Sequence, residues 1–156
     1  MKYIFNKYTY QNRETEYWIE LNAEMYSIRQ INIGFPYGLV ISCLEFGLAE
    51  DQIILEDMLG EVIELTKEQF DKKWYELLLP YRDMWEEIKN RYTINSIFIG
   101  QVNYFYPQGT IIKSDEAIAV AKEVESSFAF EQVQGKVVGY DEQNMWLIVE
   151  GLKLKK

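Results

Sequence analysis

Apolar and polar residues alternate along most of the first forty-four positions, which is the pattern of strands with one buried face. Tyr, Ile and Phe are frequent in these stretches. The pattern predicts strands over Lys2–Tyr10, Glu16–Leu21, Tyr26–Ile33 and Leu39–Leu44. A turn at Gly34–Gly38 separates the last two, because its Pro and Gly residues favour turn backbone angles. We therefore expect an antiparallel sheet of about four strands.

A helical period replaces the alternation after Thr66. Thr66 is followed three residues later by Gln69, which is the spacing of a capping box at a helix N-terminus. Phe70, Trp74, Leu77 and Leu78 then fall on one helical face. Pro80 must end or kink this helix, and helical spacing resumes over residues 81–92. We predict one long or Pro-kinked helix that packs against the sheet.

The last third of the chain returns to strands after a polar stretch at Thr93–Ser96. Strands are predicted over Ile97–Tyr106 and Thr110–Lys113, and a hairpin is predicted from Lys136–Tyr140 and Met145–Glu150. Ser114 and Asp115 favour a short helix over residues 116–125, although the alternation of Ile118 and Val120 leaves a strand as the alternative. The predicted fold class is α+β, with domains at residues 1–92 and 93–156.

The charge of the chain is uneven. Its net charge is −9 with a pI near 4.6, and residues 1–92 hold 17 acidic and 10 basic side chains. No Lys or Arg occurs between Ile31 and Thr66. We define the acidic segment as the seven acids of that window, which are Glu45, Glu50, Asp51, Glu56, Asp57, Glu61 and Glu64. Large apolar residues are interleaved with them, so the segment is the first candidate for a partner-binding surface.

The residue types needed for common enzyme chemistry are scarce. The chain has no His and one Cys, Cys43, which lies in an apolar run and is expected to be a small buried hydrophobe. A thiolate nucleophile would lack its usual base, and zinc would lack its usual ligands. No EF-hand loop or phosphate-binding Gly-rich loop occurs. Adjacent acids such as Glu56 and Asp57 are typical of a solvated loop. We expect no catalysis, no cofactor and no metal site.

The sequence shows neither a signal peptide nor a membrane-spanning segment, and this predicts the cellular compartment. Residues 1–7 do not contain the apolar core of a signal peptide, and no run approaches the ~20 apolar residues that span a bilayer. A cytoplasmic protein is expected. Because an acidic protein repels phosphate backbones and membrane surfaces, the expected partner is a basic protein and not a nucleic acid or a membrane.

The N-terminal half carries a family resemblance. The strands Glu16–Leu21 and Tyr26–Ile31 and the later Phe70–Trp74 helix resemble a small bacterial domain family. In that family a strand ending in an acidic turn precedes a strand with an Arg before an aliphatic residue. Such domains are similar to the immunity proteins that accompany bacterial polymorphic and contact-dependent toxins. The resemblance implies inhibition of a co-encoded toxin by protein–protein interaction, and it transfers no functional residues.

The C-terminal part carries a second resemblance. Residues 100–112 are similar to the opening hairpin of OB-type barrels such as the RNA-binding repeats of a ribosomal protein, and residues 136–150 resemble the closing hairpin. The resemblance implies a small OB-like barrel and an alternative function in single-stranded RNA binding. Tyr104, Phe105 and Tyr106 would stack on bases, and Lys113 would contact phosphate. The sequence departs from that activity because few Lys residues accompany these aromatics.

Overall fold

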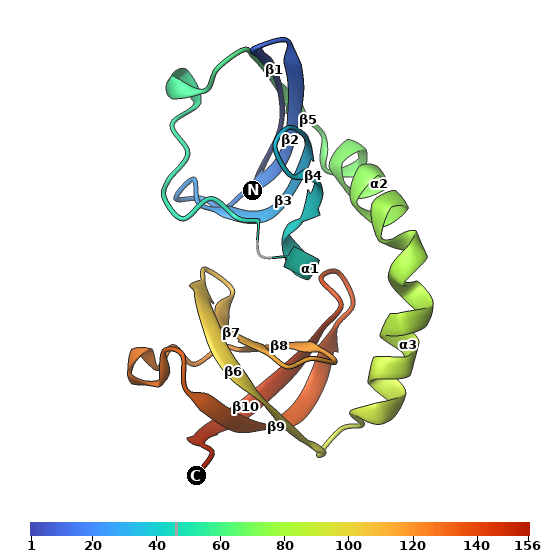
Figure 1. Cartoon of the computed structure of the whole chain (residues 1–156), viewed down its shortest axis with the longest axis vertical. Coiled ribbons are helices and arrows are strands. Elements are labelled where there is room, and N and C mark those ends of the chain that lie inside the picture. The colour runs from blue at the N-terminus through green and yellow to red at the C-terminus, as the bar shows by residue number, and fades with distance from the viewer. Residues whose placement is uncertain (46) are drawn as a thin grey trace. The chain divides into compact units, whose positions relative to one another are not determined.

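The computed structural model describes residues 1–45 and 47–156, and the side chain of Glu45 is outside the description (Figure 1). The fold class is α+β, as predicted. Contacts divide the chain into two units, Met1–Leu79 and Pro80–Lys156. The sequence predicts a domain boundary at residue 92. That boundary concerns domains that fold independently, and it stays a prediction. Each unit is described by itself below.

The first unit contains an antiparallel sheet. Its described strands are β1 (Lys2–Tyr10), β2 (Arg13–Leu21), β3 (Ser27–Gly34), β4 (Gly38–Ile41) and β5 (Glu61–Leu65), in the spatial order β4-β3-β2-β1-β5. The first four correspond to the predicted strands, although β2 begins at Arg13 and not at Glu16, and β4 ends at Ile41. The one-turn helix α1 (Ser42–Glu45) follows, so the prediction of a strand to Leu44 was wrong at its end. Strand β5 was not predicted and occupies the sheet edge beside β1.

One face of this sheet is covered by a segment within residues 47–60, which includes the 3-10 turn η1 (Leu55–Asp57). Ile4, Ile19 and Leu21 form the buried cluster on that face. Apolar residues of the covering segment pack against it, namely Ile53, Leu55 and Met58. Since successive side chains of a strand point to opposite faces, Tyr3, Glu20 and Arg29 belong to the other face.

The capping box at Thr66 is confirmed. The Thr66 hydroxyl accepts a hydrogen bond from the Gln69 backbone N–H, and the Gln69 side chain accepts one from the Thr66 backbone N–H. Helix α2 (Lys67–Leu78) follows and buries Phe70, Trp74 and Leu78. Pro80 interrupts the helix as predicted, with the 3-10 turn η2 (Leu79–Tyr81) before α3 (Arg82–Arg91). Of the described helices, none is long and apolar enough to cross a membrane.

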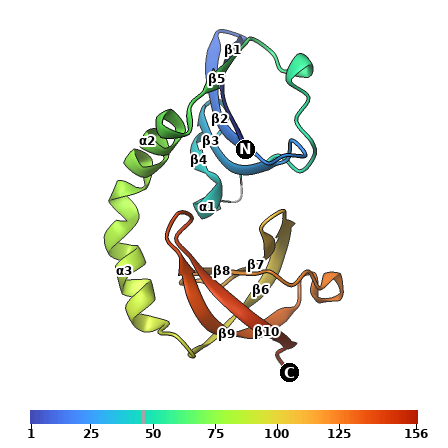
Figure 2. The same ribbon diagram turned by 180° about the vertical axis from the view of Figure 1, so that it is seen from behind.

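The second unit closes its strands into a barrel, which Figure 2 shows from behind. The described strands are β6 (Ile97–Tyr106), β7 (Gly109–Lys113), β8 (Ile118–Ala121), β9 (Gln132–Asp141) and β10 (Trp146–Leu154), in the order β10-β8-β7-β6-β9. The pairing of β8 with β10 is parallel and the others are antiparallel. The helix predicted at 116–125 was wrong, and the strand that the alternation of Ile118 and Val120 left open is confirmed. Strand β8 and the 3-10 turn η3 (Ser126–Phe128) lie there instead.

Helix α3 is attached to the barrel by its aromatic residues. Trp85 donates its indole N–H to Glu142 at 2.7 Å and meets the Tyr140 ring edge-on at 6.1 Å. The Tyr140 hydroxyl donates to the backbone carbonyl of Tyr92 at 2.9 Å. The barrel interior is filled by residues that include Phe98, Val102, Ile111, Val137, Leu147 and Val149. These contacts explain why α3 groups with the barrel and not with the sheet.

Candidate functional site

The acidic segment is held to the sheet by its own backbone and apolar side chains. The buried Asn6 of β1 donates its side-chain N–H groups to the carbonyls of Leu59 and Glu61, at 2.8 and 3.0 Å. The Ile53 backbone N–H donates to the Met25 carbonyl at 2.9 Å. Gly60 turns the chain into β5 with φ of +77°, where a side chain would overlap the Lys7 carbonyl. The backbone is therefore fixed on both sides of η1.

This attachment directs the charges outward. Ile53, Leu55 and Met58 face the core, whereas all six described acidic side chains are exposed, which are Glu50, Asp51, Glu56, Asp57, Glu61 and Glu64. Glu64 pairs with Lys2 at 3.5 Å. In the described part of the chain, the other five form no ion pair. Glu45, the seventh predicted residue, has its side chain outside the description.

The six carboxylates follow the segment and do not converge on one point. Glu50 and Asp51 lie beside the β2–β3 turn, because the adjacent Gln52 donates its side-chain N–H to the Glu24 carbonyl at 2.8 Å. Glu56 and Asp57 are in η1. Glu61 and Glu64 are three residues apart on β5 and point to opposite faces. No group of three or more described His, Cys, Asp or Glu side chains is arranged to hold a metal ion.

Three large apolar side chains are exposed within the same segment. Ile54, Leu59 and Ile63 are 58%, 64% and 42% exposed. Covering these aliphatic groups with a partner favours binding, by about 25 cal/mol for each Å² of apolar surface that is removed from water. Their position between exposed acids gives the segment the two components of an interface, namely apolar anchors and charges.

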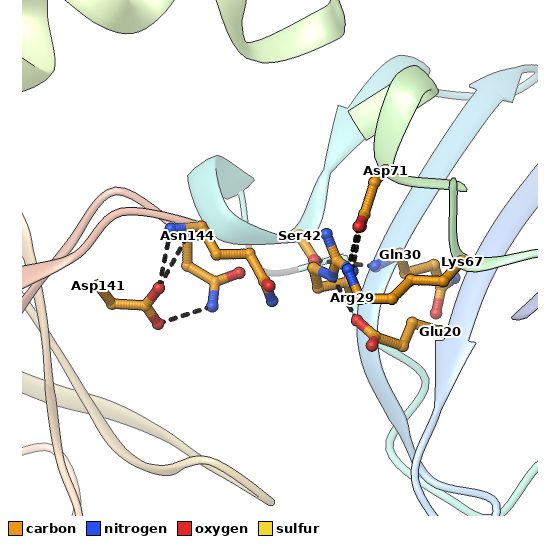
Figure 3. Close-up of polar contacts among 9 residues, drawn as sticks. Glu20, Arg29, Gln30, Ser42, Lys67, Asp71, Asp141 and Asn144 are labelled. Carbon is orange, nitrogen blue, oxygen red and sulfur yellow. Dashed lines mark hydrogen bonds and ion pairs between the residues drawn. The ribbon is translucent and has the colours of Figure 1, made fainter. Parts of the chain in front are cut away.

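A buried charge cluster lies on the opposite face of the same sheet, and the sequence did not identify it (Figure 3). Arg29 is 1% exposed and donates to Glu20 through Nε and to Asp71 of α2 through Nη2, the latter at 2.7 Å. Its guanidinium also lies over the rings of Phe70 and Trp74, 4.7 and 5.1 Å from their centroids. Lys67 binds the other oxygen of Asp71. We assign this cluster to stability, because Arg29 and Glu20 are buried and form an ion pair with each other.

The pKa of Asp71 in this cluster gives a testable acid dependence. Burial opposes ionisation of Asp71, but hydrogen bonds from Lys67 and Arg29 outweigh burial and lower its pKa. A lowered folded-state pKa contributes stability above the unfolded value of about 3.9, and that contribution is lost as pH falls through the folded pKa. We expect Asp71→Asn to be less stable than wild type at pH 7 and to lose less stability below about pH 4.

Urea unfolding measured from about pH 2 to pH 7 checks this expectation. Glu76→Gln is the matched control, since Glu76 is an exposed carboxylate on the same helix. Equal acid dependence in wild type and Asp71→Asn would contradict the assignment of the lowered pKa to the ion pairs of Asp71.

The aromatic residues of the alternative RNA site lie on β6. The rings of Tyr104 and Tyr106 are stacked on each other, with centroids 5.7 Å apart. Phe105 lies between them in the strand and therefore points to the opposite side. Lys113 is exposed at the far end of β7, opposite Gln101. The three aromatics do not form one continuous stacking surface.

The chain was also compared with known proteins. It matches no protein-family model, no curated protein and no solved structure.

Proposed function

We propose that this chain is a non-catalytic binding protein that docks a basic protein partner through the acidic segment, as an immunity-type inhibitor of a bacterial toxin would. The single observation that carries the proposal is the exposure, along one segment, of five unpaired carboxylates and of Ile54, Leu59 and Ile63, on a backbone that hydrogen bonds fix to the sheet. A fixed backbone lowers the entropic cost of binding, because the segment is ordered before the partner arrives.

The distribution of charge supports a basic partner. Residues 1–79 hold 14 acidic and 7 basic side chains, for a net charge of −7, whereas residues 80–156 hold 11 and 9, for −2. A field of this sign raises the rate of encounter with a cationic surface by ~10- to 1,000-fold at low salt. A toxin that acts on nucleic acid presents such a surface in its substrate cleft. A cytoplasmic location, where that toxin would act, is part of the proposal.

Two finer features of the fold are proposed with the function. We infer that α2 packs on the sheet face that carries Tyr3 and Arg29. The inference is based on the Tyr3–Phe70 ring contact and the Arg29–Asp71 ion pair. We also infer that the barrel is OB-like, on the basis of its strand order and its parallel β8–β10 pairing. RNA binding by this barrel is the weaker alternative, since its unit carries no net positive charge and its aromatics face two sides of β6.

The charge reversal Glu56→Lys with Asp57→Lys tests the proposed interface. The proposal predicts a co-encoded basic toxin domain as the partner to assay, and stopped-flow fluorescence measures its association at several salt concentrations. We expect association to slow by about tenfold at low salt and its salt dependence to flatten, because steering is lost. Dissociation should change less than association.

The matched control is Glu123→Lys with Glu131→Lys, which makes the same change in net charge on exposed acids of the second unit. It should associate faster than the η1 double variant. Equal rates for the two double variants would show that net charge alone acts and would remove the acidic segment as the docking surface. The variant Leu59→Ala tests the apolar part of the interface. We expect the complex to dissociate faster, because an apolar anchor is lost.

A further inference from the structure

A cavity of about 500 Å³ lies on the sheet face that the covering segment borders. It is lined by Tyr17, Gln30, Asn32, Tyr37, Val40 and residues 47–49. Tyr17 and Asn32 are paired across β2 and β3, so their side chains stand together on this face. Cavities of about 300–1,000 Å³ are the usual size of small-molecule sites. All of its lining residues belong to the first unit.

A chain of hydrogen bonds fixes the polar floor of this cavity. The buried Gln30 accepts hydrogen bonds at Oε1 from the Ser27 hydroxyl and the Ala49 backbone N–H, both at 3.1 Å. Its Nε2 then donates to Asn32 Oδ1 at 2.9 Å. The bond from Gln30 fixes the orientation of the Asn32 amide, with Oδ1 toward Gln30 and Nδ2 beside Gly47 of the lining. The Asn32 amide is therefore oriented as a donor before any ligand binds.

Tyrosines form the second part of the lining. The rings of Tyr8 and Tyr17 are stacked with centroids 6.0 Å apart, and Tyr37 at the rim is 79% exposed. Burial and a hydrogen bond with Tyr8 raise the pKa of Tyr17 to about 12. Its hydroxyl is neutral near pH 7, as that of an ordinary tyrosine is. The lining residues carry no charge. The nearby cation at this end of the sheet, Arg13, lies over the Phe35 ring, 4.3 Å from its centroid.

We propose that this cavity binds a neutral, hydroxyl-bearing ring, with Asn32 Nδ2 and the tyrosine hydroxyls as hydrogen-bond partners of its oxygens and the Tyr37 ring against its flat face. An ionic ligand is disfavoured, because the lining offers no opposite charge to offset the desolvation of an ion. Val40, Leu48 and Ala49 supply the apolar wall that such a ring needs. A free saccharide and the ribose of a nucleoside share this chemistry. Gly47, Leu48 and Ala49 lie within the window of the acidic segment, but none of the six described acids of that segment lines the cavity, and the proposal does not depend on the proposed inhibitor function.

The experiment is a titration of the ¹⁵N-labelled full chain followed by NMR at the side-chain amides of Asn32 and Gln30. The neutral probes are cellobiose and uridine, and their charged counterparts are glucosamine and UMP. We expect saturable shifts of the Asn32 amide with at least one neutral probe below about 20 mM, and weaker binding of the charged probes. Binding of cellobiose alone assigns a saccharide, and binding of uridine alone assigns a ribose.

Variants decide whether the shifts report this cavity. Asn32→Leu should weaken binding by about tenfold through the lost hydrogen bond. Tyr37→Ala, at a largely exposed position that the fold tolerates, should also weaken it, whereas Tyr10→Ala, at an exposed tyrosine outside the lining, should not. The proposal is overturned by the absence of shifts with both neutral probes, by tighter binding of the charged probes, or by equal binding of Tyr37→Ala and Tyr10→Ala.

Discussion

Replacing Arg29 with alanine is expected to lower the free energy of unfolding of the first unit by about 3–5 kcal/mol. The substitution leaves two carboxylates, Glu20 and Asp71, without the guanidinium that neutralises them. Glu20 is 3% exposed, so water cannot replace the lost donor without a rearrangement of the sheet. The packing of the guanidinium on Phe70 and Trp74 is lost in the same step.

Denaturant unfolding followed by tryptophan fluorescence measures this effect. Lys67→Ala is the control, because Lys67 binds the same Asp71 carboxylate with a side chain that is 59% exposed. Such a pair contributes at most about 1 kcal/mol. A loss below about 1 kcal/mol for Arg29→Ala would show that the buried charges are not coupled as the structure indicates.

A triple variant separates the net value of the cluster from the cost of breaking it. In Glu20→Gln, Arg29→Met, Asp71→Asn the three charges are removed together. We expect it to be more stable than Arg29→Ala alone, because no uncompensated buried charge remains. If it is less stable than wild type, the ion pairs stabilise the fold by more than their desolvation cost.

The importance of Arg29 was not predicted, although the sequence contains a sign of it. Alternation places Arg29 on the same strand face as Ile31 and Ile33. A charged residue among the apolar positions of a strand face is a candidate for a buried ion pair. Its partners are 9 and 42 residues away in the sequence. Identifying them requires the register of β2 with β3 and the position of α2, neither of which a local pattern specifies.

The segment after β7 shows how a correct local motif led to a wrong element. Ser114 does accept hydrogen bonds from the backbone N–H groups of Glu116 and Ala117, as an N-cap would. The same bonds close a turn, and residues 118–121 then pair with β7 and with β10. Pairing with β10 links positions almost thirty residues apart. The pairing of residues 118–121 with these two strands therefore selects the strand over the short helix.

Exposure along the acidic segment was better predicted than its structure. Charge predicted correctly that Glu50, Asp51, Glu56 and Asp57 face solvent, because isolated carboxylates are costly to bury. Strand β5 was missed since only Val62 and Ile63 carry β-propensity between its acids. Acids on an edge strand are consistent with its position, because charge there discourages edge-to-edge association with another copy.

The second large effect is expected from Gly109→Ala, which should lower the free energy of unfolding of the barrel by about 3 kcal/mol. Gly109 closes the β6–β7 hairpin with φ of +139°, a conformation that side chains rarely adopt. A Cβ there would also overlap the backbone carbonyl of Ala121 on β8. Because Gly109 is packed against β8, relief of that overlap requires movement of a second strand and not of the turn alone.

Gly139→Ala is the matched control, since Gly139 has an ordinary φ and a Cβ there would come no closer than 3.5 Å to Ile148. It should change stability by less than about 1 kcal/mol. Labelling with 5-fluorotryptophan separates the units, because Trp18 and Trp74 report the first and Trp85 and Trp146 the second. If the units unfold independently, Arg29→Ala shifts only the first pair of signals and Gly109→Ala only the second. Coincident shifts in both variants would mean that the α2–α3 connection couples the two units into one cooperative fold.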